Sequence, residues 1–184
     1  EGEYSAIFYD STLFKVTNSS TFWLSEFPDS VSFGWDAACK RICTYGLFEN
    51  TITHQQFWVF NTHFDHIGTI AREKSSQLIL SKIKELNRSE LPVILMGDFN
   101  STNESKAIQT ICLTMNDSYN ISEVLPSGPK GTFNGFNPSI LPEDRIDYIF
   151  VSGIGVRSYS NIDNRRTDGL FISDHFPVLV ELQN

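Results

Sequence analysis

Four short polar motifs, each at the end of or within an apolar strand-like run, constrain this sequence more than any other feature. They are Asn61-Thr62-His63-Phe64-Asp65-His66, Gly97-Asp98-Phe99-Asn100, Arg145-Ile146-Asp147-Tyr148 and Ser173-Asp174-His175. Catalytic and binding groups commonly gather at the ends of the strands of a rigid sheet. The pattern therefore predicts an active site assembled along one edge of a β-sheet.

Length and composition predict one compact domain over residues 1–184. The chain has 184 residues, of which 40% are hydrophobic and 13% aromatic, so it can bury one core but hardly two. A charged fraction of 20% is too low, and the aromatic residues are too many, for a disordered chain. Strand-like and helix-like segments alternate along the sequence, which predicts an α/β fold.

Charge and cysteine content exclude several classes of protein. A net charge of −8 argues against tight, sequence-independent binding to duplex nucleic acid, which needs many Lys or Arg contacts to phosphate. Cys39, Cys43 and Cys112 form neither an even disulfide framework nor a paired metal motif, so small buried thiols are expected. No apolar run approaches the roughly 20 residues of a membrane span.

Periodicity places the main elements. Strands are expected over residues 4–9, 13–16, 21–24, 41–48, 56–61, 92–96, 147–152 and 177–182. Apolar residues recur at helical spacing over 69–87, and Asn103 is suited to cap a short helix over 104–113. The stretch 127–142, rich in Gly, Pro and Asn, predicts a mobile surface loop in which Phe133 and Phe136 are either anchors or part of a substrate rim. A polar connection is expected over 157–168.

Asp98 follows a continuous apolar run, which is typical of a strand buried on both faces. Its side chain should therefore emerge where that strand ends. An aspartate after a strand is, on its own, usually part of an Asx turn. The presence of three other polar strand-end motifs favours a functional role here.

Asp147 has apolar neighbours, and a carboxylate in such a place is costly to bury without a hydrogen-bond partner. The imidazole of His175 is a suitable partner, because a carboxylate on one ring nitrogen fixes the tautomer and leaves the other nitrogen for chemistry. Taken alone, His175 would more often be a satisfied buried histidine. His63 and His66, three residues apart after a strand, fit either direct roles or a turn.

Together the four motifs resemble, in kind and order, those of the endonuclease/exonuclease/phosphatase superfamily, which includes pancreatic-type deoxyribonuclease, abasic-site endonucleases, sphingomyelinases and inositol polyphosphate phosphatases. Phe22-Trp23-Leu24-Ser25-Glu26 and Gly34-Trp35-Asp36-Ala37-Ala38 look like the bacterial branch of small metal-dependent hydrolases. The resemblance implies a four-layer α/β/β/α sandwich of two packed mixed sheets. The family's N-terminal strand with its Asn, and its Gln-Glu motif, have no match, so the chain is expected to lack that segment and to hold the C-terminal two thirds or more of the domain. Because the Glu of that motif is a principal magnesium ligand in the family, the chain by itself is expected to bind Mg²⁺ weakly and to show little or no hydrolysis.

The resemblance also implies roles for individual residues. The catalytic set is His63, Asp98, Asn100, Asp147 and His175; the phosphate-binding set is Arg41, His66 and Asn100; the metal set is Asp174 and Asp98. In this assignment Asp98 aligns or deprotonates the attacking water, and Asn100 holds the phosphate or Asp98. His175, oriented by Asp147, acts as base or transition-state stabiliser, and His63 as general acid or phosphate ligand. Mg²⁺ is the expected cofactor, with Mn²⁺ as a substitute.

The resulting hypothesis is a Mg²⁺-dependent phosphoesterase acting on a small molecule, a nucleotide, a lipid head group or a short nucleic acid. Arg41, Arg145, Arg165 and Arg166 are candidates for a focused positive patch that attracts such anions. One alternative is a catalytically silent phosphate-binding or partner-binding module of the same fold, and another is a cysteine hydrolase. Sheet edges uncovered by the unmatched N-terminal strands are expected to favour self-association.

Overall fold

The computed structural model describes residues 4–139 and 141–183, which form strands and helices that alternate along much of the chain. The strands are β1 (Phe14–Trp23), β2 (Ile42–Asn50), β3 (Gln56–His63), β4 (Val93–Asp98), β5 (Asn116–Asp117), β6 (Asp147–Ser152), β7 (Val156–Asn161) and β8 (Val178–Leu182). The helices are α1 (Thr69–Leu86), α2 (Lys106–Cys112) and α3 (Ser118–Ile121). None of these helices is both long and apolar enough to cross a membrane.

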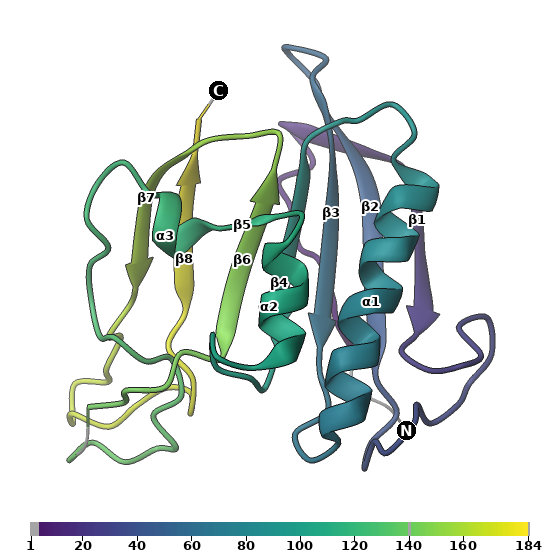
Figure 1. Cartoon of the computed structure of the whole chain (residues 1–184). Helices are drawn as coiled ribbons and strands as arrows, with labels where there is room; N and C mark the ends of the chain where they lie inside the picture. Colours follow the sequence, from purple (N-terminus) through teal and green to yellow (C-terminus); the bar gives the residue numbers. More distant parts are fainter. Residues whose placement is uncertain (1–3, 140, 184) are drawn as a thin grey trace.

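The strands form one large mixed sheet and one small sheet. The large sheet has the order β1-β2-β3-β4-β6-β5, and the small sheet contains β7 and β8. Helices α1 and α2 lie side by side over one face of the large sheet, and the small sheet lies beyond β6 (Figure 1). The mixed α/β architecture with two sheets is thus confirmed. Over 4–139 and 141–183 the small sheet is a two-stranded antiparallel pair, and the short helix α3 lies against β7.

Strand register brings three of the polar motifs to one end of the large sheet. β3 and β4 are parallel, joined through α1 as parallel neighbours require, and His63 pairs with Asp98. β4 and β6 are antiparallel, and Asp98 pairs with Asp147. The three residues therefore stand side by side on adjacent strands, which is the juxtaposition that the strand-end motifs predicted.

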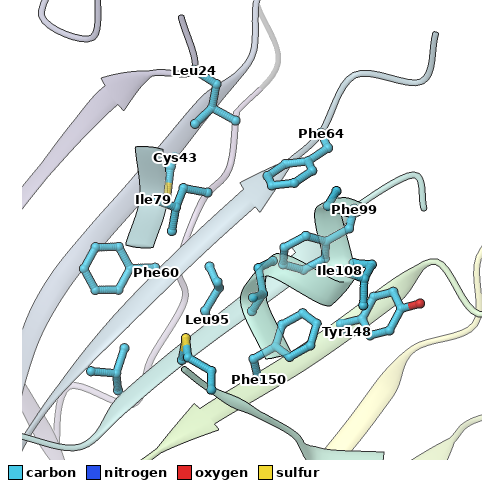
Figure 2. Close-up of a cluster of buried hydrophobic side chains, with 14 of the residues drawn as sticks. Leu24, Cys43, Phe60, Phe64, Ile79, Leu95, Phe99, Ile108, Tyr148 and Phe150 are labelled. Atoms are coloured by element: carbon cyan, nitrogen blue, oxygen red, sulfur yellow. The ribbon is translucent and has the colours of Figure 1, made fainter. Parts of the chain in front are cut away.

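The core lies between the two helices and the large sheet, and it is strongly aromatic. Ile79 of α1 and Ile108 of α2 point toward side chains of the sheet, including Phe60, Phe150 and Tyr148 (Figure 2). Phe99, directly after Asp98, is fully buried, with its ring 4.8 Å from that of Phe64 and 5.3 Å from that of Phe150, centroid to centroid. Apolar residues inside the polar motifs thus anchor the strand ends that carry the site.

Some sequence-based boundaries were wrong. Residues 4–9 form no strand, and Tyr4 and Phe8 are more than nine-tenths exposed; their β-propensity is not expressed because no neighbouring strand pairs with this segment. The strands expected over 13–16 and 21–24 are one strand, β1, with an irregular register between Val16 and Asn18. Helix α2 begins at Lys106, because the hydroxyl of Ser105, and not Asn103, accepts the hydrogen of the Ile108 N–H.

The polar connection expected over 157–168 is partly a strand. β7 has a polar sequence, Val-Arg-Ser-Tyr-Ser-Asn, but Val156 and Tyr159 are buried while Arg157 points to solvent. Its pairing with β8 supplies the hydrogen bonds, and two large side chains are enough to fix its inner face. The Gly-rich stretch 127–142 has no helix or regular strand over its described residues, as expected.

Gly97 is a position that only glycine fits. Its φ is +142°, and a Cβ built there would lie 1.8 Å from the carbonyl oxygen of Thr62 on β3. We expect Gly97→Ala to lower the free energy of unfolding by about 3 kcal/mol, from backbone strain and overpacking together. Gly169→Ala is the matched control, since Gly169 also has a positive φ, +81°, but open space around it, and its cost should be about 1 kcal/mol. Equal losses in urea denaturation would contradict the steric argument.

Candidate active site

The carboxylate of Asp98 lies between two histidines at the end of β4. Its Oδ2 is 3.3 Å from Nε2 of His63 and 3.8 Å from Nε2 of His175. All three side chains border solvent, with between 16% and 37% of each exposed. The carboxylate and both rings are therefore reachable by a ligand yet held by the strand ends.

The predicted pair of Asp147 and His175 is present. Nδ1 of His175 and Oδ2 of Asp147 are 2.8 Å apart, which is a charge-assisted hydrogen-bond distance. This hydrogen bond raises the pKa of His175 above its ordinary value, against the opposing effect of burial. The carboxylate occupies Nδ1, so Nε2 is the ring nitrogen that faces Asp98.

The pKa values of Asp98 and His63 also shift, each in the direction that its surroundings dictate. Burial, followed by the negative charge of Asp147, raises the pKa of Asp98. Burial, followed by the positive charge of Arg41, lowers the pKa of His63. The two histidines thus differ in character at neutral pH, because His175 is biased toward the imidazolium and His63 toward the neutral ring.

Asn100 is held in a fixed orientation beside Asp98. Its backbone N–H donates to Oδ1 of Asp98 at 2.8 Å, and its side-chain amide donates to the carbonyl oxygen of Phe64 at 2.9 Å. Asn100 has a φ of +46°, a left-handed conformation that asparagine tolerates better than most residues. The side-chain amide of Asn100 is therefore already engaged in a hydrogen bond with the backbone.

Arg41 and His66 come together on the β3 side of the site. A guanidinium nitrogen of Arg41 is 3.4 Å from Nδ1 of His66, and the charge of Arg41 is felt at both His63 and Asp98. Arg41 is buried, with its Nε 3.9 Å from a carboxylate oxygen of Asp65. The structure thus joins the predicted phosphate-binding residues to the predicted catalytic ones.

Asp65, which the sequence analysis did not single out, organises this corner. Its two carboxylate oxygens accept hydrogens from four backbone N–H groups, those of Ala38, Cys39, Ile67 and Gly68. Burial by itself raises the pKa of Asp65, but the four donors outweigh it and lower the pKa to about 2. Its place in the first polar motif was a signal, although nothing there distinguished a backbone organiser from a catalytic group.

Asp174 lies beside this group and not within it. It is half-buried, its negative charge raises the pKa of His175, and Oδ1 is 3.4 Å from the hydroxyl oxygen of Ser173. A cavity of about 390 Å³ opens next to Asp98, Asp147 and His175, and it is also lined by Asn61 and Phe176. The cavity thus borders the Asp147–His175 pair and Asp98, whereas Arg41, His63, His66 and Asn100 do not line it.

Two groups of side chains are close enough to hold a metal ion among the described residues. In the first, ligand atoms of Asp98, Asp147 and His175 lie within 4.8 Å of one another; the second consists of Cys39, Asp65 and His66. The second fits a metal poorly because the oxygens of Asp65 already accept four N–H hydrogens. The first fits a cation well, because a positive ion would offset the repulsion between Asp98 and Asp147.

The structure does not support two further expectations. Arg145 is paired with Asp117 and lies against the rings of Tyr119 and Tyr148, while Arg165 and Arg166 pair with Asp163 and Asp168. These three guanidinium groups therefore form no free positive patch with Arg41. The cysteines are not all buried as expected, since Cys43 is buried, Cys39 is partly buried and Cys112 is exposed. Desolvation raises the pKa of Cys43 and of Cys112, which makes both thiols poor nucleophiles and weighs against a cysteine hydrolase that uses either of them.

Comparison with known proteins identifies the class to which this fold and site belong. Residues 7–175 match the model of the Endonuclease/Exonuclease/phosphatase family, and the chain belongs to that family. The structure of a mannosyl-6-phosphatase, Bt3783, from Bacteroides thetaiotaomicron VPI-5482 is 39% identical, with a TM-score of 0.90, over 96% of this chain and 69% of that one.

Two proteins of lower sequence identity are also similar to this chain. Uncharacterized protein L388 of Acanthamoeba polyphaga mimivirus is 28% identical over 176 residues, and the match covers 86% of this chain and 62% of that protein. The chain thus spans less than two thirds of the length of this curated relative. The human Nocturnin catalytic domain with bound sulfate has the same fold at 20% identity, with a TM-score of 0.70, over 94% of this chain and 61% of that one.

The contact between Asp147 and His175 predicts a pH effect. Asp147→Asn should lower the pKa of His175, because an amide stabilises the imidazolium less than a carboxylate does. Since the native pKa is raised, the pair stabilises the folded state below the ordinary imidazole pKa, and that contribution is lost as pH rises through the raised value. Histidine NMR titration without divalent ions would measure the change. Asp163→Asn, at an exposed aspartate, is the control, and an unchanged pKa in Asp147→Asn would contradict the assignment.

Proposed function

We propose that this protein is a Mg²⁺-dependent phosphoesterase whose active site is the group His63, Asp98, Asn100, Asp147 and His175. The observation that carries the proposal is the position of Asp98, with a histidine on either side and the Asp147–His175 hydrogen bond behind one of them. A phosphoester is an anion and needs oriented donors and charge compensation more than a covalent partner. This arrangement supplies both next to an open cavity.

The residues present fit a divalent cation. Asp98 is the central ligand in the proposal, and ligand atoms of Asp147 and His175 lie within 4.8 Å of it and of each other. Asp174, the other ligand expected from the sequence, lies outside this group. Carboxylate oxygens are what Mg²⁺ prefers and Mn²⁺ accepts. Burial, followed by the repulsion from Asp147, raises the pKa of Asp98, and a cation beside both carboxylates would favour the charged form. When bound, the ion would neutralise charge that develops on the phosphate oxygens.

The protein's own groups have distinct tasks in this proposal. Asp98 accepts a hydrogen from the attacking water and so aligns its lone pair with phosphorus. Imidazolium at His175, favoured by Asp147, donates through Nε2 to a phosphate oxygen and stabilises the transition state. Arg41, His63, His66 and Asn100 would contact the remaining oxygens, His63 as a ring whose neutral form is favoured by burial and by the charge of Arg41, which lower its pKa.

A sugar phosphate monoester is the substrate class that we favour. The relative named as a mannosyl-6-phosphatase is 39% identical and matches 96% of this chain. The net charge of −8 and the pairing of Arg145, Arg165 and Arg166 with carboxylates weigh against a long nucleic acid. Hexose 6-phosphates should accordingly be hydrolysed faster than a phosphodiester such as bis(p-nitrophenyl) phosphate. The reverse order would contradict the substrate class but leave the phosphoesterase proposal standing.

In the full-length protein, Asp98→Asn and His175→Ala should each lower phosphoesterase turnover at least about 100-fold, the usual scale for a lost acid-base or oriented electrostatic group. His54→Ala is the matched control for the histidine change, because His54 is 74% exposed on the turn between β2 and β3. Steady-state kinetics on purified variants with unchanged thermal unfolding would measure the effect. Wild-type rates in either variant would refute these roles.

Metal removal tests the cofactor separately. Chelation by EDTA should abolish turnover, and Mg²⁺ should restore it, with Mn²⁺ as a weaker or comparable substitute. Isothermal titration should find that Asp98→Asn weakens Mg²⁺ binding relative to Asp168→Asn, whose carboxylate pairs with Arg166 instead. Full activity after chelation would exclude the metal-dependent mechanism. Metal and phosphate binding without any turnover would favour the silent binding module.

A further inference from the structure

Residues 131–135, which we call the cross-segment, contact both the start of β6, which carries Asp147, and the segment before β8, which carries His175. Thr132 is completely buried, and its hydroxyl oxygen accepts hydrogens from the backbone N–H groups of Ile146 and Asp147, at 3.0 and 3.1 Å. Its carbonyl oxygen accepts from the N–H of Phe176 at 2.7 Å. One residue thus contacts the start of β6 and the approach to β8 at the same time.

Asn134 holds the other end of the cross-segment. It is 7% exposed, its backbone N–H donates to the carbonyl oxygen of Asp174 at 2.7 Å, and its side-chain amide donates to that of Ser173 at 3.0 Å. Between these two anchors, Phe133 forms an isolated antiparallel bridge with His175. The main chain on both sides of His175 is therefore fixed to the cross-segment.

This connection matters because Asp147 and His175 belong to different parts of the fold. β6 is a strand of the large sheet and β8 of the small one, and no ladder joins these two strands over the described ranges. The 2.8 Å contact between the side chains depends on how the two sheets are placed relative to each other. A displacement of about 1 Å is enough to impair a reacting constellation.

We propose that Thr132 and Asn134 are positioning residues, which hold the main chains of Asp147 and His175 at the separation that their hydrogen bond requires. The catalytic consequence rests on the proposed function, in which His175 stabilises the transition state. The geometry itself does not depend on that function. Neither residue touches the reacting atoms in this assignment, and each acts through the pair.

Thr132→Val keeps the shape of the side chain but removes the acceptor for two buried N–H groups, whereas Thr132→Ser keeps the hydroxyl. We expect Thr132→Val to lower kcat about 10-fold with KM within about twofold, and Thr132→Ser to restore kcat. Asn134→Ala should lower kcat similarly, and it serves if Thr132→Val does not fold. Ser127→Ala, at an exposed hydroxyl of the same loop that contacts Ser160, is the control and should leave kcat unchanged.

Two further measurements separate positioning from general destabilisation. In an Asp147→Asn background, Thr132→Val should lower kcat by less than about twofold, since its effect passes through Asp147. In protein without metal, NMR should show the hydrogen-bonded Nδ1 proton of His175 in the wild type and Thr132→Ser, but a shifted or lost signal in Thr132→Val and Asn134→Ala.

The NMR signal also separates failure of this inference from failure of the proposed function. An inactive full-length wild type with the expected NMR differences would refute the phosphoesterase proposal and keep the positioning role. Folded Thr132→Val and Asn134→Ala variants with the wild-type signal and full kcat would overturn the positioning role. Additive losses of kcat in the Asp147→Asn background would overturn it as well.

Discussion

The hydrogen bond between Asp147 and His175 is the interaction on which the rest of the site depends, because it joins the large sheet to the small one at the reacting end. It occupies Nδ1 of His175 and turns Nε2 toward Asp98, 3.8 Å away. The same carboxylate raises the pKa of both His175 and Asp98. One contact between two sheets thus sets the orientation of the imidazole and the charge balance around it.

Several residues of the polar motifs stabilise the backbone conformation around the site. Gly97 permits β4 to approach the carbonyl of Thr62, Asn100 adopts a left-handed conformation beside Asp98, and the oxygens of Asp65 accept four N–H hydrogens. Phe99 meanwhile anchors the end of β4 in the aromatic core. A rigid strand end of this kind holds the carboxylate in place before any ligand arrives, which is the condition for electrostatic stabilisation of a transition state.

Membership of the Endonuclease/Exonuclease/phosphatase family accounts for the architecture, while the substrate of the proposed phosphoesterase depends on the surroundings of the site. Those surroundings are not cationic in the part of the chain described, since three of the arginines expected to attract anions are paired with carboxylates. Recognition of phosphate in the proposal therefore falls to Arg41 and the histidines near it. A compact phosphoester suits so local a set of donors better than an extended polyanion.

The sequence by itself determined the order of the motifs, the strand, helix and strand that place His63 beside Asp98, and the partnership of Asp147 with His175, because these follow from periodicity and from the cost of burying a lone carboxylate. It did not determine that β7 is a strand, that residues 4–9 are not, that Arg145 pairs with Asp117, or that Thr132 links two sheets. Each of these depends on a partner distant in sequence. Pairing between strands and contacts between loops are long-range interactions, and only the tertiary structure decides which of the possible partners is met.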